Sequence, residues 1–347
     1  MKSEPRFILS KKAVLKQYRL IKELCFNVSY SFKTNHEVGY ILRDNTDCMF
    51  SVHSLASVNL LGCPRRIWFF LQGIDLQEAK ELLSIGIRNF VADNETDLNV
   101  LLDFLKNNKG YSKVSLLLRM KLKENTIHTG KHFVFGMPSR KVKTLIGRLK
   151  AEGLFEKLGI HFHRKTQNIS EWSLKDELEQ SLDEECLNAI DILNMGGGIP
   201  AEYKNFRGGI TNNVFQKIKE LKNWLIPYGI DLIAEPGRFI AAPAVNLETE
   251  IVNIYDNNII VNASIYSGAM DTFVSHIRLA VHGELADGEG KAYTIKGKTP
   301  DSIDIFRYRV FLDNPKPGDK IVFLNAGAYT YSTDFCGLKK PKTIIAD

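Results

Sequence analysis

The lysine at position 33 is the first residue whose type and place in the sequence could do chemistry. It stands at the end of the short apolar run SYSF, which predicts a strand near residues 30–32. Burial beside a protein core disfavours the charged form of an amine, lowers its pKa and suits it to form a Schiff base with an aldehyde. A solvated lysine in a basic chain is the plain alternative, but the position of Lys33 at a strand end makes it a candidate nucleophile.

A run of three glycines, Gly196 to Gly198 in NMGGGIP, follows a strand predicted over residues 191–195. Glycines expose backbone N–H groups that can approach phosphate oxygens without interference from Cβ atoms. The same triplet suits an ordinary tight turn, so both interpretations stay open for this segment alone. The spacings GxGxxG and GxxxxGK[ST] are absent from this loop, which disfavours nucleotide binding.

The sequence EPGR places a carboxylate and a guanidinium around a rigid turn after a strand predicted over residues 231–235. A carboxylate beside a pyridine-type nitrogen keeps that nitrogen protonated and makes the ring an electron sink. Glu235 could do this, with Gly237 and Arg238 beside it. The alternative for an isolated segment of this kind is a surface ion pair at a turn.

Two histidines stand two positions apart in HFHRKTQ, where a strand predicted over residues 159–163 ends. The ring of His163 could stack on a flat cofactor, and His161 would share its face of the strand. A histidine pair could instead bind a metal ion, but no carboxylate or cysteine ligand stands nearby in the sequence. No metal site is therefore predicted.

Eight short runs that favour β-structure recur along the chain, with amphipathic helical segments between them. They lie near residues 30–32, 49–52, 67–71, 89–92, 114–120, 159–163, 191–195 and 231–235. Strands that alternate with helices predict parallel pairing and right-handed crossovers. Eight such units closing on themselves give an α/β fold of the TIM-type (β/α)8 class, although an open doubly wound sheet fits the same pattern.

A barrel of this class places reactive groups at the C-terminal ends of its strands and a phosphate site in the loops after the last two. Lys33 ends the first predicted strand and His163 ends the sixth. The glycine run and the EPGR turn follow the seventh and the eighth. We therefore expect all of these groups at one mouth of the barrel.

After about residue 245 the helical pattern stops, and strand-like segments joined by Gly, Pro, Asn and Asp turns follow. The length of 347 residues also favours two domains. We expect a barrel over residues 28–245 and a C-terminal β-sandwich or β-barrel domain over residues 246–347. Residues 1–27 are expected to pack with the C-terminal domain.

The overall composition bounds the class of protein. The formal charge of +6, from 46 basic and 40 acidic residues, is spread along the chain and disfavours nucleic-acid binding. Five cysteines form no CxxC pair, which predicts reduced thiols in a cytoplasmic enzyme without a zinc framework. No stretch approaches the roughly 18 apolar residues of a membrane span, so no membrane partner is expected.

Together these segments resemble the fold-type III pyridoxal-phosphate enzymes, in the ornithine, diaminopimelate and arginine decarboxylase family, and they are most similar to its ornithine branch. SYSFKTN resembles the family's lysine motif, IHFHRKTQ its stacking-histidine motif, LNMGGGIP its glycine loop and IAEPGRFI its glutamate–arginine turn. NAGAYT resembles its phosphate-binding tyrosine segment. The resemblance covers nearly the whole chain and implies an alanine racemase-like fold, in which a β domain follows the barrel.

The resemblance implies pyridoxal 5'-phosphate as the cofactor. Lys33 would bind its aldehyde, His163 would stack on its ring and Glu235 would pair with the ring nitrogen. The other cofactor-binding residues implied are Arg119, Thr166, Gly197, Gly198, Gly237, Arg238 and Tyr329. The implied catalytic residues are Lys33, His163 and Asp301, of which Asp301 would act in the partner subunit's site in a homodimer.

The implied reaction is decarboxylation of a small-molecule amino acid to an amine. The substrate would be a basic diamino acid similar to ornithine, or a modified or carboxylated diamine. Two alternatives stay open: a racemase or other non-decarboxylating enzyme on the same fold, and a non-catalytic regulatory relative. Retention of the cofactor-binding residues disfavours the second alternative.

Three positions depart from the family pattern. Pro300 replaces a cysteine that aids protonation of the product, and Ala263 and Ser51 replace aspartates. Loss of one carboxylate of a charge-assisted pair would cost a cationic distal group about 1.5 to 3 kcal/mol, so another distal group becomes plausible. The cations that could meet a distal carboxylate are Lys296, Lys298 and Arg307.

Overall fold

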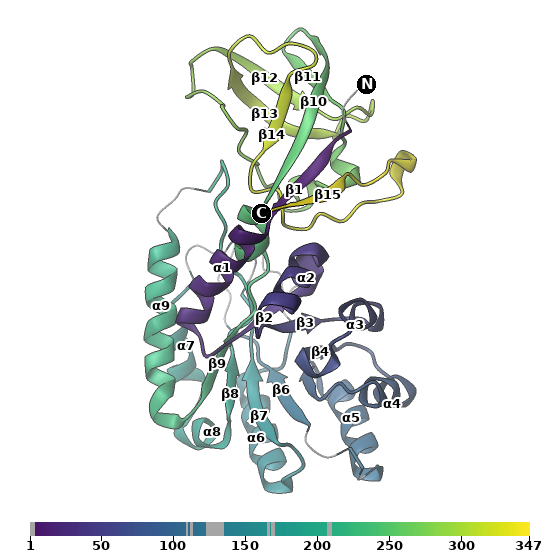
Figure 1. Cartoon of the computed structure of the whole chain (residues 1–347). Helices are drawn as coiled ribbons and strands as arrows, with labels where there is room; N and C mark the ends of the chain where they lie inside the picture. The colour runs from purple at the N-terminus through teal and green to yellow at the C-terminus, as the bar shows by residue number, and fades with distance from the viewer. Residues whose placement is uncertain are drawn as a thin grey trace.

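The computed structural model describes residues 4–108, 110–111, 114–122, 135–164, 167, 171–206 and 210–347. Eight parallel strands close into a barrel in sequence order, with a separate sheet beyond one end of it (Figure 1). The barrel strands are β2 (Asn27–Ser31), β3 (Met49–Val52), β4 (Ile67–Leu71), β5 (Asn89–Ala92), β6 (Ser115–Arg119), β7 (Lys157–His161), β8 (Ile192–Asn194) and β9 (Asp231–Ala234). The predicted eight-fold barrel is confirmed, and the open doubly wound sheet is excluded.

Apolar side chains fill the barrel interior. Trp68 and Phe70, two positions apart on β4, point inward and form a cluster that is separate from the main core. Its other buried members are Val91, Leu117, Ile192 and Ile233. Side chains at the intervening positions, such as Phe69, pack outward against the helices. Because both faces of each strand are buried, the strands appear in the sequence as almost continuous apolar runs.

Helices surround the barrel, and several of them begin at a residue whose side chain caps the helix. They are α1 (Lys11–Leu24), α2 (His36–Asn45), α3 (Leu55–Leu61), α4 (Leu76–Ser84), α5 (Glu95–Asn107), α6 (Ser139–Glu152), α7 (Leu174–Ser181), α8 (Glu184–Ala189) and α9 (Ile210–Leu225). Asn35 caps α2 by accepting hydrogen bonds from the amides of Glu37 and Val38. A side-chain cap of this kind satisfies helix N–H groups that have no partner in the helix, and it fixes where the preceding turn ends.

The second sheet joins the two ends of the chain. Its order is β13-β12-β11-β10-β1-β15, and β14 also pairs with β10. The strands are β1 (Arg6–Ser10), β10 (Val245–Tyr255), β11 (Asn258–Val261), β12 (Lys291–Lys296), β13 (Ile305–Leu312), β14 (Lys320–Phe323) and β15 (Lys342–Ala346). β1 runs antiparallel to β10 and parallel to β15, so the first strand of the chain belongs to the C-terminal sheet.

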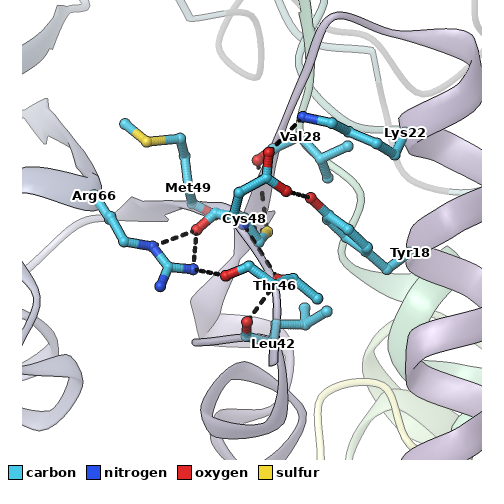
Figure 2. Close-up of polar contacts among 9 residues, drawn as sticks. Tyr18, Lys22, Val28, Leu42, Thr46, Cys48, Met49 and Arg66 are labelled. Carbon is cyan, nitrogen blue, oxygen red and sulfur yellow. Dashed lines mark hydrogen bonds and ion pairs between the residues drawn. The ribbon is translucent and has the colours of Figure 1, made fainter. Parts of the chain in front are cut away.

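The loop between α2 and β3 is held at the N-terminal end of the barrel strands by Arg66 (Figure 2). Its guanidinium donates to the Cys48 carbonyl at 2.9 and 2.6 Å, and to the carbonyls of Thr46 at 2.9 Å and Arg43 at 2.8 Å. One planar fork therefore satisfies one carbonyl group of the last turn of α2 and two of the loop that follows it.

The same loop is tied to α1 by Asp47. Its carboxylate accepts hydrogen bonds from the Tyr18 hydroxyl and from Lys22 Nζ, the latter at 2.8 Å. Burial raises the pKa of the Tyr18 hydroxyl, and its hydrogen bond to Asp47 raises it further. The contacts lie at the end of the barrel where stability rather than chemistry is expected to reside.

Arg66→Leu should lower the free energy of unfolding by about 1–3 kcal/mol, because these three carbonyls lose their donor. Cofactor binding per folded molecule should stay unchanged, since the loop lies at the opposite end of the strands from Lys33. Urea denaturation measures the first effect and cofactor titration the second. Arg65→Leu, at an exposed neighbouring position, is the matched control. Equal stability of the two variants would contradict the role given to Arg66.

Candidate active site

A pocket of about 120 Å³ lies at the C-terminal mouth of the barrel. Nine of the residues proposed from sequence as cofactor ligands line it: Lys33, Arg119, His163, Gly197, Gly198, Glu235, Gly237, Arg238 and Tyr329. Thr166 lies outside the described residues. A larger groove of about 600 Å³ runs between α6 and α8 on the outside of the barrel, but no proposed site residue lines it. The chemistry therefore belongs to the smaller and deeper hollow.

Lys33 lies in a short 3-10 turn, Phe32–Thr34, that follows β2 directly. Two contacts from the C-terminal domain hold this turn. The Tyr329 amide donates to the Thr34 carbonyl at 2.8 Å, and the Asn35 side chain donates to the Gly327 carbonyl at 2.9 Å. Desolvation lowers the pKa of the Lys33 amine, and this lowering outweighs the opposite effect of Glu235. More of the amine is therefore neutral and nucleophilic near neutral pH.

Glu235 follows β9 and is buried among three side-chain donors. Its Oε1 accepts from the Ser51 hydroxyl at 2.7 Å and from the Asn194 amide at 2.9 Å, and its Oε2 lies 3.2 Å from His161 Nε2. Burial alone would raise the pKa of Glu235. The interaction with His161 and the hydrogen bonds from Ser51 and Asn194 reverse that effect and lower the pKa to about 2. Glu235 is thus a buried, ionised acceptor.

Ser51 has a definite function in this arrangement. Its hydroxyl lies 2.8 Å from that of Ser29 and donates to Glu235, so the two serines and the carboxylate form a chain across β2, β3 and β9. An aspartate at position 51 would set a second negative charge against Glu235 and would raise the pKa of one of the pair. The replacement noted in the sequence therefore favours ionisation of Glu235.

His163 lies two residues beyond the end of β7, which stops at His161. The strand is thus shorter than expected, but both histidines line the same pocket. His161 is buried against Glu235, and the His163 ring is open to the pocket. His163 Nδ1 accepts a hydrogen bond from the Gly197 amide at 3.1 Å. Desolvation, together with Arg119 and His161, lowers the pKa of His163 to about 3, so the ring is neutral.

The glycine run packs so closely against the backbone that larger residues do not fit. A Cβ at Gly196 would lie 2.2 Å from the Phe162 carbonyl oxygen, and one at Gly197 would lie 2.9 Å from that of Glu235. Gly196 and Gly198 also have positive φ angles of 66° and 97°. Within the part of the chain that the structure describes, the Gly198 amide has no hydrogen-bond acceptor, so it can receive an anion.

Arg238 begins α10 (Arg238–Ala241) and is fixed from several sides. It forms a two-pronged ion pair with Asp271 of α11 (Asp271–Val274), with one contact at 3.0 Å, and donates to the Tyr203 hydroxyl at 2.9 Å. Its guanidinium also lies 5.6 Å from the Tyr203 ring centre and 5.1 Å from that of Tyr329. Arg238 therefore approaches the pocket in one fixed orientation.

Arg119 ends β6 and is paired before any ligand arrives. Its Nη1 donates to Asp93 Oδ1 at 3.0 Å, and its guanidinium lies 5.4 Å from the centre of the Phe135 ring. The pair leaves the pocket wall nearly neutral at this side. Sequence reasoning identified Arg119 but not its partner, since Asp93 follows a different strand.

The structure also brings residues into the pocket that sequence reasoning did not single out. They are Ser31, His53, Phe70 and Ile199. His53 could have been found, because it follows β3 by one residue as Lys33 follows β2 by two. Phe70 had no such signal, because nothing local separates an inward aromatic residue from its outward neighbours.

Two residues from the β domain lie away from the pocket of their own chain. Asp301 Oδ1 accepts hydrogen bonds from the Tyr266 hydroxyl at 3.2 Å and from the Ile303 amide at 2.9 Å, and it does not line the pocket. Arg307 is buried, with its guanidinium on the Leu279 carbonyl and on Glu284. The suggestion that Arg307 meets a distal carboxylate is therefore wrong, because its side chain is buried and its two terminal nitrogens already bind the Leu279 carbonyl and Glu284.

Comparison with known proteins identifies the family. The pyridoxal-binding domain of the pyridoxal-dependent decarboxylases matches residues 16–242. Lysine/ornithine decarboxylase of Selenomonas ruminantium is 25% identical over 284 residues, which cover 78% of this chain and 70% of that protein. Diaminopimelate decarboxylase of Helicobacter pylori is 23% identical over 91% of this chain and 82% of the relative. The chain belongs to the pyridoxal-dependent decarboxylases.

Solved structures agree on the fold. Lysine decarboxylase of Selenomonas ruminantium superposes with a TM-score of 0.81 at 22% identity, covering 98% of this chain and 92% of that one. Diaminopimelate decarboxylase of Helicobacter pylori, solved with L-lysine, gives a TM-score of 0.82 at 19% identity, with coverage of 99% and 92%. The barrel and the mixed sheet of this chain thus recur together in decarboxylases.

The pocket fits the cofactor of this family, pyridoxal phosphate. Lys33 offers an amine of lowered pKa for an aldehyde, and Glu235 offers an ionised carboxylate for a ring nitrogen. The glycine run offers a cradle that a Cβ would obstruct, with Arg238 beside it for a phosphate.

In the described residues no helix could cross a membrane, and no three metal-binding side chains gather together.

Asp271→Asn should lower the free energy of unfolding by about 3–5 kcal/mol, because it removes the negative charge of the two-pronged ion pair with the buried Arg238 guanidinium. Thermal and urea denaturation of the cofactor-free protein measure the effect. Glu289→Gln removes an exposed acidic group and serves as the control. A loss no larger than that of the control would show that the Arg238–Asp271 pair does not stabilise the junction of the domains.

Proposed function

We propose that this decarboxylase removes the α-carboxylate of a diamino acid or of a carboxylated diamine, with Lys33 as the residue that binds the cofactor. The observation that carries the proposal is the convergence of Lys33, Glu235 and the glycine run on one pocket. These groups come from β2, β9 and β8, and the barrel closure alone brings them together. The amine can react with an aldehyde, the buried carboxylate can pair with a ring nitrogen, and the glycine run can bind a phosphate. One flat molecule, pyridoxal phosphate, carries all three of these groups.

Each residue then has a distinct task. Pyridoxal phosphate supplies an aldehyde for the substrate amine and a ring that accepts an electron pair. Lys33 would hold the cofactor until the substrate amine replaces it, and Glu235 would keep a proton at the ring nitrogen. His163, fixed by its hydrogen bond from Gly197, would lie against the ring face. Fixed groups of this kind cost little reorganisation when charge develops.

Relatives support the substrate class without naming one substrate. They include decarboxylases named for lysine and ornithine, for diaminopimelate and, in Campylobacter jejuni, for carboxynorspermidine and carboxyspermidine. The last is 26% identical over 54% of this chain. All of these names denote substrates with a second nitrogen. Ala263, which stands where the ornithine branch has a carboxylate for the distal amine, favours a substrate with a different distal group.

The assembly we propose is a homodimer with shared active sites. Asp301 lies beside Tyr266, whose ring centre is 4.3 Å from that of Phe335. The neighbourhood exposes large apolar side chains: Phe273, Val274, Ile303, Tyr331 and Phe335. An exposed apolar surface next to a carboxylate that does not reach its own pocket suits a second copy of the chain, into whose pocket Asp301 would project. The five free cysteines support a cytoplasmic location.

Lys33→Ala should abolish the visible absorption band of the bound cofactor and lower carbon dioxide release at least about a thousand-fold, because covalent attachment is lost. The test screens L-lysine, L-ornithine, L-arginine, diaminopimelate and carboxyspermidine for carbon dioxide release. Lys80→Ala, on the outer surface of α4, is the control. Unchanged turnover in Lys33→Ala would remove that lysine from the mechanism. Deuterium exchange at Cα without carbon dioxide release would instead indicate a non-decarboxylating enzyme.

Mixing Asp301→Ala with Lys33→Ala should restore part of the activity that each variant lacks. A mixed dimer has one site in which the intact Lys33 of one chain meets the intact Asp301 of the other. The measurement is carbon dioxide release after refolding the two chains together, with sedimentation to establish the dimer. The double variant mixed with either single variant is the control. Full activity of Asp301→Ala alone would refute the shared site.

A further inference from the structure

His53 is an imidazole of the pocket for which the mechanism above has no task. It follows β3 by one residue and lines the pocket with Lys33 and Glu235. Its ring lies against Phe70, with centres 4.6 Å apart and planes tilted by 43°, and Phe70 in turn meets His161 edge to face at 5.1 Å. The ring therefore has a fixed place. Its nitrogens have no hydrogen-bond partner in the described chain, so they remain available to a ligand.

The place of His53 in the barrel decides what it can meet. The glycine run follows β8 and Arg238 follows β9, so the phosphate end of the cofactor belongs to that side of the mouth. His53 follows β3, and Phe70 lies on β4. Around the barrel, β2 stands between β3 and β9, and β5, β6 and β7 stand between β4 and β8. His53 thus lies on a side of the mouth away from the glycine run, which leaves this side for the substrate.

Each of the other imidazole and guanidinium groups that line the pocket already has at least one partner. His161 is engaged by Glu235, His163 by the Gly197 amide and Arg119 by Asp93. Lys33 is reserved for the cofactor. Of the imidazoles that the structure describes in this pocket, His53 is the one with both nitrogens open to a ligand.

We propose that His53 donates a hydrogen bond to the α-carboxylate of the substrate and orients this group for loss. The inference rests on the proposed function. In the reaction the bond between Cα and the carboxylate carbon breaks, carbon dioxide leaves, and the electron pair passes to the cofactor ring. A proton from solvent then adds to Cα. His53 neither gives nor takes a proton, and its task is to hold the bond that breaks perpendicular to the ring, where its electrons can enter the π system.

A neutral donor suits this task better than a cation. Desolvation, together with the nearby Lys33 and Arg119 charges, lowers the pKa of His53 to about 4, so the ring carries no charge at neutral pH. A cation would pair with the carboxylate before reaction and would stabilise the ground state more than the transition state, in which that charge disappears. The ion pair with Asp93 partly neutralises Arg119, a second cation of the pocket wall.

The first test compares binding of amino acids with binding of the matching amines. L-lysine with cadaverine and L-ornithine with putrescine are titrated into the cofactor-loaded enzyme, and the visible absorption of the cofactor is followed. His53→Leu should weaken amino-acid binding about ten-fold, as expected for one hydrogen bond to a charged group, and leave the amines unchanged. His53→Gln keeps an N–H donor and should recover most of the amino-acid affinity. Equal loss for both members of a pair would overturn the proposal.

The second test measures which bond at Cα reacts. In deuterated water, His53→Leu should incorporate deuterium at Cα of recovered amino acid faster, relative to carbon dioxide release, than the wild type does. A residue that only supports the fold would slow both reactions together. An unchanged ratio, with folding and cofactor absorption intact, refutes the role of His53 and leaves the proposed function standing. If the wild-type enzyme binds neither the amino acids nor the amines and releases no carbon dioxide, the role of His53 and the proposed function are both refuted.

Discussion

The pocket depends on one physical constraint, which is that the carboxylate of Glu235 must stay ionised inside the protein. Burial opposes this, and only converging donors reverse the balance. Those donors come from β3, β7 and β8, while Glu235 itself follows β9, so the same hydrogen bonds that set the charge also fix the relative heights of four strands. Chemistry and barrel register are thus coupled: an error in strand alignment would leave a buried charge unpaired, which is among the costliest defects a fold can carry.

The rest of the pocket follows a related pattern, in which charge is compensated locally. Arg119 is ion-paired with Asp93, and Arg238 is ion-paired with Asp271. Each guanidinium therefore presents hydrogen-bond donors in a fixed geometry, while its partner offsets much of its positive charge. Lys33 differs because desolvation makes its amine easier to deprotonate. The result is a wall of fixed, nearly neutral donors around one reactive amine. Donors of this kind can bind a phosphate and a carboxylate without binding either group too tightly for the reaction to proceed. Turnover requires this balance.

Much of this could be predicted from the sequence, and the failures have physical causes. The eight strands were predictable because strands buried on both faces leave unbroken apolar runs, and the site followed from the rule that chemistry lies at strand ends. The end of β7 was placed two residues too late because apolar periodicity continues through Phe162 although strand pairing has ended. Asp93 and Asp271 were missed because ion pairs between distant elements leave no local pattern. Arg307 was misjudged because a charge in the sequence does not reveal the carbonyl and the glutamate that already bind it.

The position of β1 between β10 and β15 affects how the chain is made. During synthesis residues 6–10 leave the ribosome before the barrel segments, and both of their sheet neighbours follow more than two hundred residues later. β1 therefore has neither of its strand partners while the barrel segments emerge. An unpaired strand edge at that stage is prone to aggregate and is a target for chaperones.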